Sequence, residues 1–270
     1  MPCLSIIFPI HTRSKPGMNY TVDAVTDALK VLLAVANNPG LGVSEYGRRV
    51  GLTKARTFRF LATFEASGFV LRTANAAAYV LGPQALILGL AAQEQVGLTQ
   101  LAQKYLDALV AQFNETASVL IRNGLESVNV LQTRSAHDVR VQTTIGRRRP
   151  LHAGASGKVL AAFGPPEIEQ ALLAGDLVKV APQTITSKKL LRRELQRVRQ
   201  QGYAKSVSEG AADVLAITAP VFDPSGLAQA SIGLSLPVSR APNDLTTMIR
   251  AVSDAASQLS GELGWRNKQT

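Results

Sequence analysis

The hydrophobic pattern of the chain changes near residue 98, and this change limits the folds that the chain can adopt. Before it, apolar residues recur at helical spacing. After it, short alternating segments are interleaved with further helices. The length of 270 residues is enough for about two domains at roughly 150 residues each. The hydrophobic fraction of 46% is ordinary for a globular protein, so a wholly disordered chain is excluded.

Several classes of protein are excluded by the early part of the chain. No apolar run reaches the roughly 18–20 residues of a transmembrane helix, and the run 4–10 contains Pro9 and follows no basic stretch. We therefore expect no membrane partner and no secretion signal. The single cysteine, Cys3, excludes an internal disulfide and is typical of the cytoplasm. We interpret residues 1–17, which lack any regular period, as a flexible tail or upstream segment before a start at Met18.

Residues 18–82 are predicted to form three helices and a two-stranded ribbon. Asn37-Asn38-Pro39-Gly40 ends the first helix because proline cannot continue it, Ser44 and Thr53 can cap the next two, and Gly68 ends the third. Residues 69–72 and 78–81 are expected to be strands. This order is that of a winged helix-turn-helix, whose second motif helix fits the major groove of DNA. The expected core face of the first helix comprises Val22, Val25, Leu29, Leu32, Leu33 and Ala36.

Positive charge gathers on this segment, in a chain whose net charge is +10. Phe58 and Leu61 are expected to point into the core, which leaves the basic side chains of the third helix free to read guanine edges or hold phosphates. A solvated helix face is the alternative. We expect Arg72 to lie on the wing, where it could contact the backbone or the minor groove. The candidate DNA-binding residues are Arg48, Arg49, Thr53, Lys54, Arg56, Thr57, Arg59 and Arg72.

Residues 83–97 are predicted to form a connecting helix with few charges. Leu86, Ile87, Leu90 and Ala91 suggest a stripe that is buried against another surface, either a second copy or the helix's own winged domain.

Residues 98–268 are predicted to form an antiparallel α+β domain, because hairpin turns join strands that alternate with separate helices. Asn123-Gly124 is typical of one such hairpin turn, and Asp223-Pro224-Ser225-Gly226 fits a type I turn. We expect helices at 101–113, 156–163, 167–174, 187–200 and 243–263, and strands at 117–121, 128–132, 139–145, 204–207, 215–221 and 228–236.

Specific motifs resemble the IclR (isocitrate lyase regulator) transcription factors. In the first half they are Gly-Leu-Thr-Lys at 51–54, Gly-Phe-Val at 68–70 and Tyr-Val-Leu-Gly at 79–82. In the second half, residues 146–158 (GRRRPLHAGASGK) are similar to the family's G-x-x-x-P-L-H-A-x-x-x-G-K stretch. The resemblance covers about residues 20–265. It implies a GAF-like effector-binding domain and a connecting helix that helps two copies associate as a homodimer or homotetramer.

This chain also departs from the family pattern. Arg56 and Phe58-Arg59 stand where the family often has Ser or Thr and His, so no operator sequence can be carried over. Asp213 and Thr218 replace the small residues that are usual at their positions.

Residues 153–157 form a small-residue turn that opens a helix. Backbone N–H groups at a helix start suit a carboxylate, although small residues can equally serve tight packing. The resemblance favours a pocket for a small effector. We expect Glu209 to be a structural acceptor. His152 could donate a hydrogen bond to the effector, but we favour a core histidine. Arg147, Arg148 and Arg149 could neutralise an effector carboxylate at the mouth of the pocket, but we favour a solvated loop. The implied lining residues are Ala153, Gly154, Ala155, Ser156, Gly157, Ser206, Ala216, Thr218, Gly233 and Ser235.

Catalytic and metal-binding motifs are incomplete. The phosphate-loop motif requires glycine where this chain has His152 and serine or threonine where it has Val159. The nucleophile-elbow motif requires glycine where the chain has Lys158. The three histidines and Cys3 lack ligand spacing, so we expect no enzyme, metal site or cofactor. The sequence instead predicts a regulator, repressor or activator, whose binding to double-stranded operator DNA is changed by a small aliphatic or aromatic acid. The alternative is a metabolite-binding protein whose winged module contacts other proteins.

Overall fold

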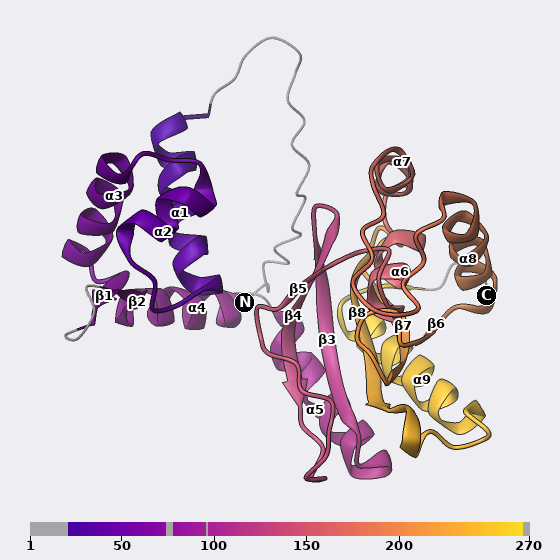
Figure 1. Cartoon of the computed structure of the whole chain (residues 1–270). Helices are drawn as coiled ribbons and strands as arrows, with labels where there is room; N and C mark the ends of the chain where they lie inside the picture. Colours follow the sequence, from indigo (N-terminus) through magenta and orange to yellow (C-terminus); the bar gives the residue numbers. More distant parts are fainter. Residues whose placement is uncertain (1–20, 74–77, 96, 267–270) are drawn as a thin grey trace. The chain divides into compact units, whose positions relative to one another are not determined.

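The computed structural model describes residues 21–73, 78–95 and 97–266 (Figure 1). The chain divides into two compact units, one up to Val96 and one from Gly97 onward. No helix within the described ranges has both the length and the hydropathy needed to span a bilayer. The expected tail at 1–17 lies outside those ranges.

The first unit has the predicted order of helices and strands. Gly51, at φ 70°, ends α2, and the Thr53 hydroxyl caps α3 by accepting the N–H of Arg56 (3.3 Å). The two strands pair antiparallel with Val70 opposite Leu81. A winged helix-turn-helix is therefore confirmed. The motif comprises α1 (Asp23–Asn37), α2 (Val43–Val50), α3 (Lys54–Ala66), β1 (Val70–Arg72) and β2 (Tyr79–Leu81), and the predicted connecting helix follows as α4 (Pro83–Gln95).

The buried face of α1 differs from the predicted one. Val31, Ala34 and Val35 form the core contact with α2, α3 and the ribbon. The expected face is instead largely exposed, because α1 carries apolar residues on two sides and periodicity alone does not say which side has a neighbour within the unit. The N-cap of α2 is Gly42 rather than Ser44. The exposed apolar residues of α1 are Val22, Val25, Leu29 and Leu33.

The second unit contains a six-stranded antiparallel sheet in the order β5-β4-β3-β8-β7-β6. The α6 helix packs on one face, and α5 and α9 cover the other, where Ile217, Ile232 and Leu234 are fully buried (Figure 1). This arrangement confirms the α+β class. The helices are α5 (Gly97–Phe113), α6 (Ala155–Ala162), α7 (Pro166–Ala174), α8 (Lys188–Gln201) and α9 (Thr246–Glu262); the strands are β3 (Thr116–Asn123), β4 (Glu126–Thr133), β5 (Arg148–Pro150), β6 (Ala204–Val207), β7 (Val214–Phe222) and β8 (Ala228–Pro237).

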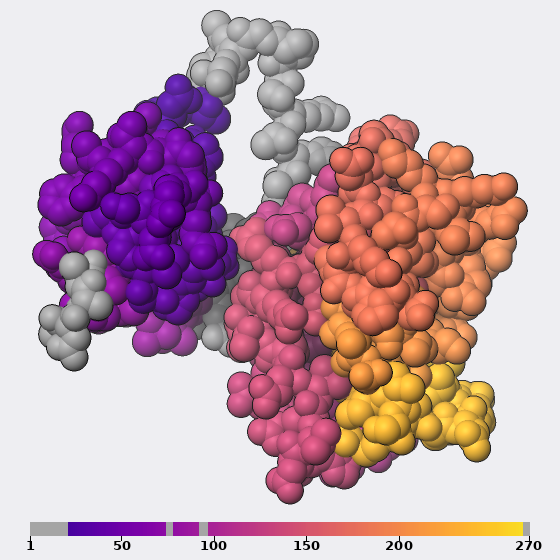
Figure 2. Space-filling model, in the orientation of Figure 1, coloured from indigo at the N-terminus to yellow at the C-terminus, as the bar shows by residue number. Residues whose placement is uncertain are grey.

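Segments from the two ends of this unit pack together. The α5 and α9 helices are in contact, and Figure 2 shows the rose-coloured early part of the unit meeting the yellow end of the chain. The hairpin turn at Gly124, with φ 61°, and the bond from the Gly226 N–H to the Asp223 carbonyl (2.9 Å) are as the sequence predicts.

Residues 139–145 do not form the predicted strand. Val139 and Ile145 are 73% and 65% exposed, so the alternation there does not bury an apolar face. The edge of β4 is taken by β5, whose Arg149 lies opposite Ser127. The last helix begins at Thr246 rather than near residue 243, and the Asp244 carboxylate accepts the Thr246 N–H (2.9 Å) at its start.

A close approach at Gly157 fixes α6 on the segment before it. A Cβ atom at Gly157 would lie 2.3 Å from the Leu151 carbonyl oxygen, so replacement by alanine must push α6 away. We expect Gly157→Ala to lower the free energy of unfolding by about 1–3 kcal/mol, measured by urea titration. Gly261→Ala in α9, where a Cβ meets nothing within 4 Å, is the matched control and should be neutral or stabilising. Equal stabilities of the two variants would contradict this account.

Candidate DNA-binding surface and effector site

The α3 helix presents basic side chains on the surface of the first unit. Lys54 and Arg59 are exposed, and neither forms an ion pair with any residue that the structure describes. Arg48 and Arg49 at the end of α2 and Arg72 on β1 are exposed as well. Figure 1 shows α3 beside α1 and α2 in this unit.

Arg56 is more constrained than its neighbours. Its guanidinium lies 3.0 Å from the Asp27 carboxylate of α1 and 5.8 Å from the centre of the Phe60 ring. Asp27 also pairs with Lys30. Arg56 therefore already has an anionic partner that ties α3 to α1, whereas Arg59 has none in the described ranges.

Two expectations for α3 are wrong. Thr57 is fully buried, and its hydroxyl donates to the Thr53 carbonyl (3.0 Å), so it serves the contact between α2 and α3 rather than DNA. Gly47 of α2 makes this possible, since a Cβ there would lie 3.1 Å from the Thr57 hydroxyl oxygen. Phe58 is 51% exposed rather than part of the core, while Leu61 is buried as predicted.

The sheet brings the predicted effector residues onto one face. Ser206, Ala216 and Ser235 lie opposite one another on β6, β7 and β8, and Thr218 and Gly233 form the adjacent row. Side chains two residues apart share a face, so all five face α6. This follows from strand register, which the sequence alone does not give.

The start of α6 lies against these rows. The Ala155 N–H donates to the Ser206 hydroxyl (3.1 Å), and the Ser156 and Thr218 hydroxyl oxygens are 3.3 Å apart. The backbone N–H groups of Ser156 and Gly157 have no hydrogen-bond acceptor in the part of the chain that the structure describes. They are therefore available to an anion at the positive end of the helix.

The ten candidate effector residues differ in how closely they are packed, in their backbone conformation and in their exposure. Gly157 and Gly233 serve tight packing, because a Cβ at either would approach a backbone oxygen to within 2.3 Å. Gly154, at φ 90°, permits the turn into α6. The partly exposed members are Ser156, Ala216 and Ser235, and the almost wholly buried ones are Ala153, Ala155, Ser206 and Thr218.

Arg149 was expected in a solvated loop, and this interpretation is wrong. It lies on β5, and an Nη atom would be 3.2 Å from a Cβ at Gly210, a residue that itself packs beside Gly154. Burial, with a contribution from Arg147, lowers the pKa of the Arg149 guanidinium to about 10. No carboxylate among the described residues pairs with it.

Arg122 lies in the same row of the sheet as Arg149 but near Gly164, which follows the end of α6, whereas Arg149 lies near the start of α6. Strand register places Arg122, Ser127 and Arg149 in one row across β3, β4 and β5. Burial lowers the pKa of Arg122, and its buried Nε has no hydrogen-bond partner in the described structure. This side of the sheet therefore holds two guanidinium groups that form no ion pair with a described carboxylate, and their common row depends on strand register, which the sequence alone does not reveal.

A buried ion cluster lies beneath α6. The Lys158 ammonium is fully buried and lies 2.8 Å from both the Glu194 carboxylate of α8 and the Glu209 carboxylate. Burial raises the pKa of Glu209, one of whose oxygens has no hydrogen-bond partner among described atoms. Burial also opposes ionisation of Glu194, but hydrogen bonds from Lys158 and Arg197 outweigh it and lower that pKa. The predicted structural role of Glu209 agrees with this geometry.

Two other predicted features have clear positions. His152 is buried, and its Nε2 lies 2.8 Å from the Val178 carbonyl oxygen, a geometry in which the ring donates. Within the described ranges, no group of three His, Cys, Asp or Glu residues could hold a metal ion; Cys3 and His11 lie outside those ranges.

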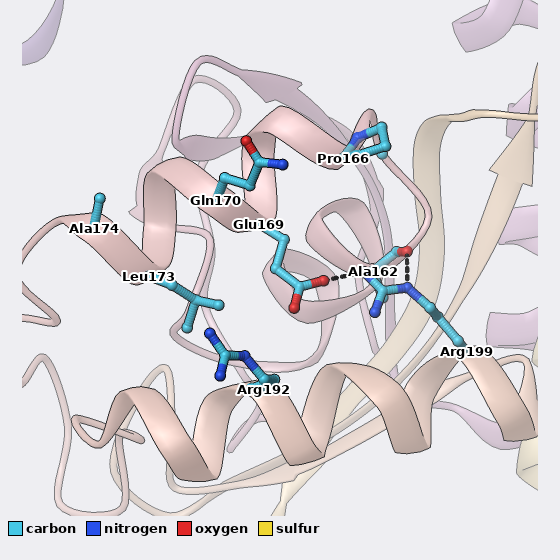
Figure 3. Close-up of a pocket in the computed structure, with 9 residues that line it drawn as sticks. Ala162, Pro166, Glu169, Gln170, Leu173, Ala174, Arg192 and Arg199 are labelled. Carbon is cyan, nitrogen blue, oxygen red and sulfur yellow. Dashed lines mark hydrogen bonds and ion pairs between the residues drawn. The ribbon is translucent and has the colours of Figure 1, made fainter.

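A groove of about 720 Å³ lies elsewhere in this unit, between the end of α6, α7 and α8. Figure 3 shows the Arg199 guanidinium between the Ala162 carbonyl and the Glu169 carboxylate, and Arg192 on α8 near Leu173. None of the predicted effector residues lines this groove.

Family models match both the first and the second part of the chain. The family model of the bacterial transcriptional regulator IclR C-terminal domain matches residues 90–261, and that of the IclR helix-turn-helix domain matches residues 24–74. The HTH-type transcriptional regulator KipR of Bacillus subtilis (strain 168) is 30% identical over 243 residues, which are 89% of this chain and 97% of KipR.

Solved structures share the fold. A putative IclR regulator from Silicibacter sp. TM1040 has a TM-score of 0.83 and 26% identity, covering 91% of this chain and 98% of that one. An IclR homologue from Microbacterium hydrocarbonoxydans, complexed with 4-hydroxybenzoate, has a TM-score of 0.76 and 22% identity, covering 89% and 98%.

The fold and the comparisons define a transcriptional regulator with a helix-turn-helix DNA-binding domain and a separate effector-binding domain, rather than an enzyme. The chain belongs to the IclR family of bacterial transcriptional regulators.

The different surroundings of Arg56 and Arg59 generate a prediction for DNA binding. We expect Arg59→Ala to weaken duplex binding more than Arg56→Ala does, because Arg56 must give up or share its bond to Asp27 to reach DNA. Loss of one phosphate contact should reduce the slope of log K against log salt by about 0.9. Fluorescence anisotropy at several salt concentrations measures both quantities. A larger loss of duplex affinity in Arg56→Ala than in Arg59→Ala would show that the ion pair with Asp27 does not keep Arg56 from contacting DNA.

The Lys158 cluster generates a prediction for stability. We expect Lys158→Met to lower the free energy of unfolding by about 3–5 kcal/mol, because it leaves buried carboxylates without their cation. The pKa values of Glu194 and Glu209 then rise above those of the unfolded chain, so the folded state holds more protons and its stability falls as pH rises. The deficit relative to wild type should be smaller at pH 5 than at pH 8.

Urea titration at the two pH values tests this, with Lys189→Met on the exposed side of α8 as the control. A deficit that does not change with pH would count against the charge argument.

Proposed function

We propose that this regulator binds double-stranded operator DNA through α3 and the wing, and that a small organic acid bound over the start of α6 changes this binding. The observation that carries the acid assignment is the position of the Arg149 guanidinium. It is partly buried, forms no ion pair with a described carboxylate, and lies against Gly210, which packs beside Gly154 at the start of α6.

The DNA half of the proposal is supported by charge and exposure. Lys54 and Arg59 project from the helix that a winged helix-turn-helix inserts into the major groove, and Arg48, Arg49 and Arg72 are exposed and suited to contact phosphates. Thr53 supports the surface as the cap of α3.

The effector half is supported by the same face of the sheet. Ser156, Ala216 and Ser235 offer a small, partly open surface, and Arg149 supplies positive charge near the turn at Gly154 that begins α6. The Microbacterium homologue is complexed with a small aromatic acid, which is in keeping with this class of ligand. Unequal binding of the acid to two states of the protein would supply about 1–3 kcal/mol of coupling, or a change of roughly 5–150-fold in operator affinity.

Apolar faces of the first unit support association of two or four copies. The exposed residues Val22, Val25, Leu29 and Leu33 lie along one side of α1. Contiguous apolar surface of this kind marks a contact with another protein surface, and we propose that a second copy covers it. The α4 helix adds exposed Leu86, Ile87, Leu88 and Leu90.

Calorimetry with a panel of small aliphatic and aromatic acids tests the effector half. We expect at least one acid to bind and its uncharged amide to bind more weakly. Arg149→Met should weaken acid binding about 10–150-fold, the effect of removing a hydrogen bond to a charged group. Arg147→Met, at an exposed neighbour, is the matched control and should change little. Binding of no acid, or equal binding of acid and amide, would overturn the proposal.

A further inference from the structure

The aromatic ring of Phe58 is exposed on the helix that faces DNA. Phe60 and Phe64 of the same helix pack against the core of the unit, whereas Phe58 is 51% exposed. Thr57 and Leu61 face the core, and successive residues are about 100° apart around an ideal helix, so Phe58 lies at the flank of the buried side. Packing within the unit thus does not account for the ring.

The neighbours of Phe58 suit a polyanion. Residues three and four positions away lie beside a helical residue, and for Phe58 these include Lys54, Ala55 and Ala62. Arg59 is the next residue along the helix. Lys54 and Arg59 are exposed, and Glu65, the acidic residue of α3, lies about two turns farther on. The small alanines leave room for close approach.

The chemistry of the ring selects one feature of the major groove. A phenylalanine side chain forms no conventional hydrogen bond, so it cannot read donor and acceptor patterns. The C5 methyl group of thymine is the apolar group that base pairs present in the major groove. We infer that Phe58 contacts a thymine methyl in each operator half-site and helps determine sequence specificity, with Lys54 and Arg59 supplying the charged contacts. This inference rests on the proposed operator binding.

Selection from random duplexes with the full chain, followed by replacement of each selected dT by dU, tests this assignment. For wild type, dU at the contacted position of one half-site should weaken binding about fourfold, the effect of losing one buried methyl-sized group. Phe58→Ala should bind dT and dU equally at that position. Phe58→Leu, which keeps an apolar side chain, should retain part of the discrimination. Circular dichroism melting checks that each variant folds.

Three results would overturn the assignment. In the first, wild type does not distinguish dT from dU at any position. In the second, Phe58→Ala retains the discrimination of wild type. In the third, Phe58→Ala changes the oligomeric state in sedimentation while base preference is unchanged, which would make Phe58 a protein contact. Failure of wild type to retain any duplex at low salt would instead contradict operator binding itself, and the Phe58 assignment with it.

Discussion

The fully buried ammonium of Lys158 is the interaction on which the second unit depends most. It joins α6 to α8 through Glu194, and to β6 with the segment directly after it through the Lys205 carbonyl and Glu209. A buried charge is tolerated only when its partners are in place, so these three elements must keep one relative arrangement. That arrangement sets the start of α6 over the rows of Ser206 and Thr218.

Basic side chains that have carboxylate partners hold the structure together, whereas those that have none are free to bind an anion. Lys158 and Arg56 have carboxylate partners and hold helices together. Lys54, Arg59 and Arg149 have no ion-pair partner in the described ranges. The net charge of +10 therefore says less about function than the places where positive charge is left unpaired. Two such places are the exposed side of α3 and the face of the sheet beside α6.

Most helices and turns could be predicted from the sequence because residues close together along the chain determine where they begin and end. Thr53 and Ser187 cap helices, Gly124 turns a hairpin, and these effects need no knowledge of distant residues. The predictions that were wrong concern residues whose surroundings depend on segments far away along the chain. The segment 139–145 alternates but buries no face, since β5 takes the edge of β4.

In the candidate sites as well, the sequence does not reveal contacts between segments that are far apart along the chain. The exposure of Phe58 depends on Thr57 packing against Gly47, which the spacing within α3 does not reveal. The position of Arg149 depends on a strand register and on Gly210, 61 positions away along the chain. The motif at residues 146–158 indicated a binding region, but only the packing separates Gly157 and Gly233 from residues that remain partly open.

The central claim is that acid binding in one unit and DNA binding in the other are coupled. The direct test measures the dissociation constant for the selected duplex with and without saturating acid, and that for the acid with and without saturating duplex. Linkage requires the two ratios to be equal, and the account predicts a common factor of roughly 5–150. A ratio of one in both experiments, with both ligands bound, would contradict it.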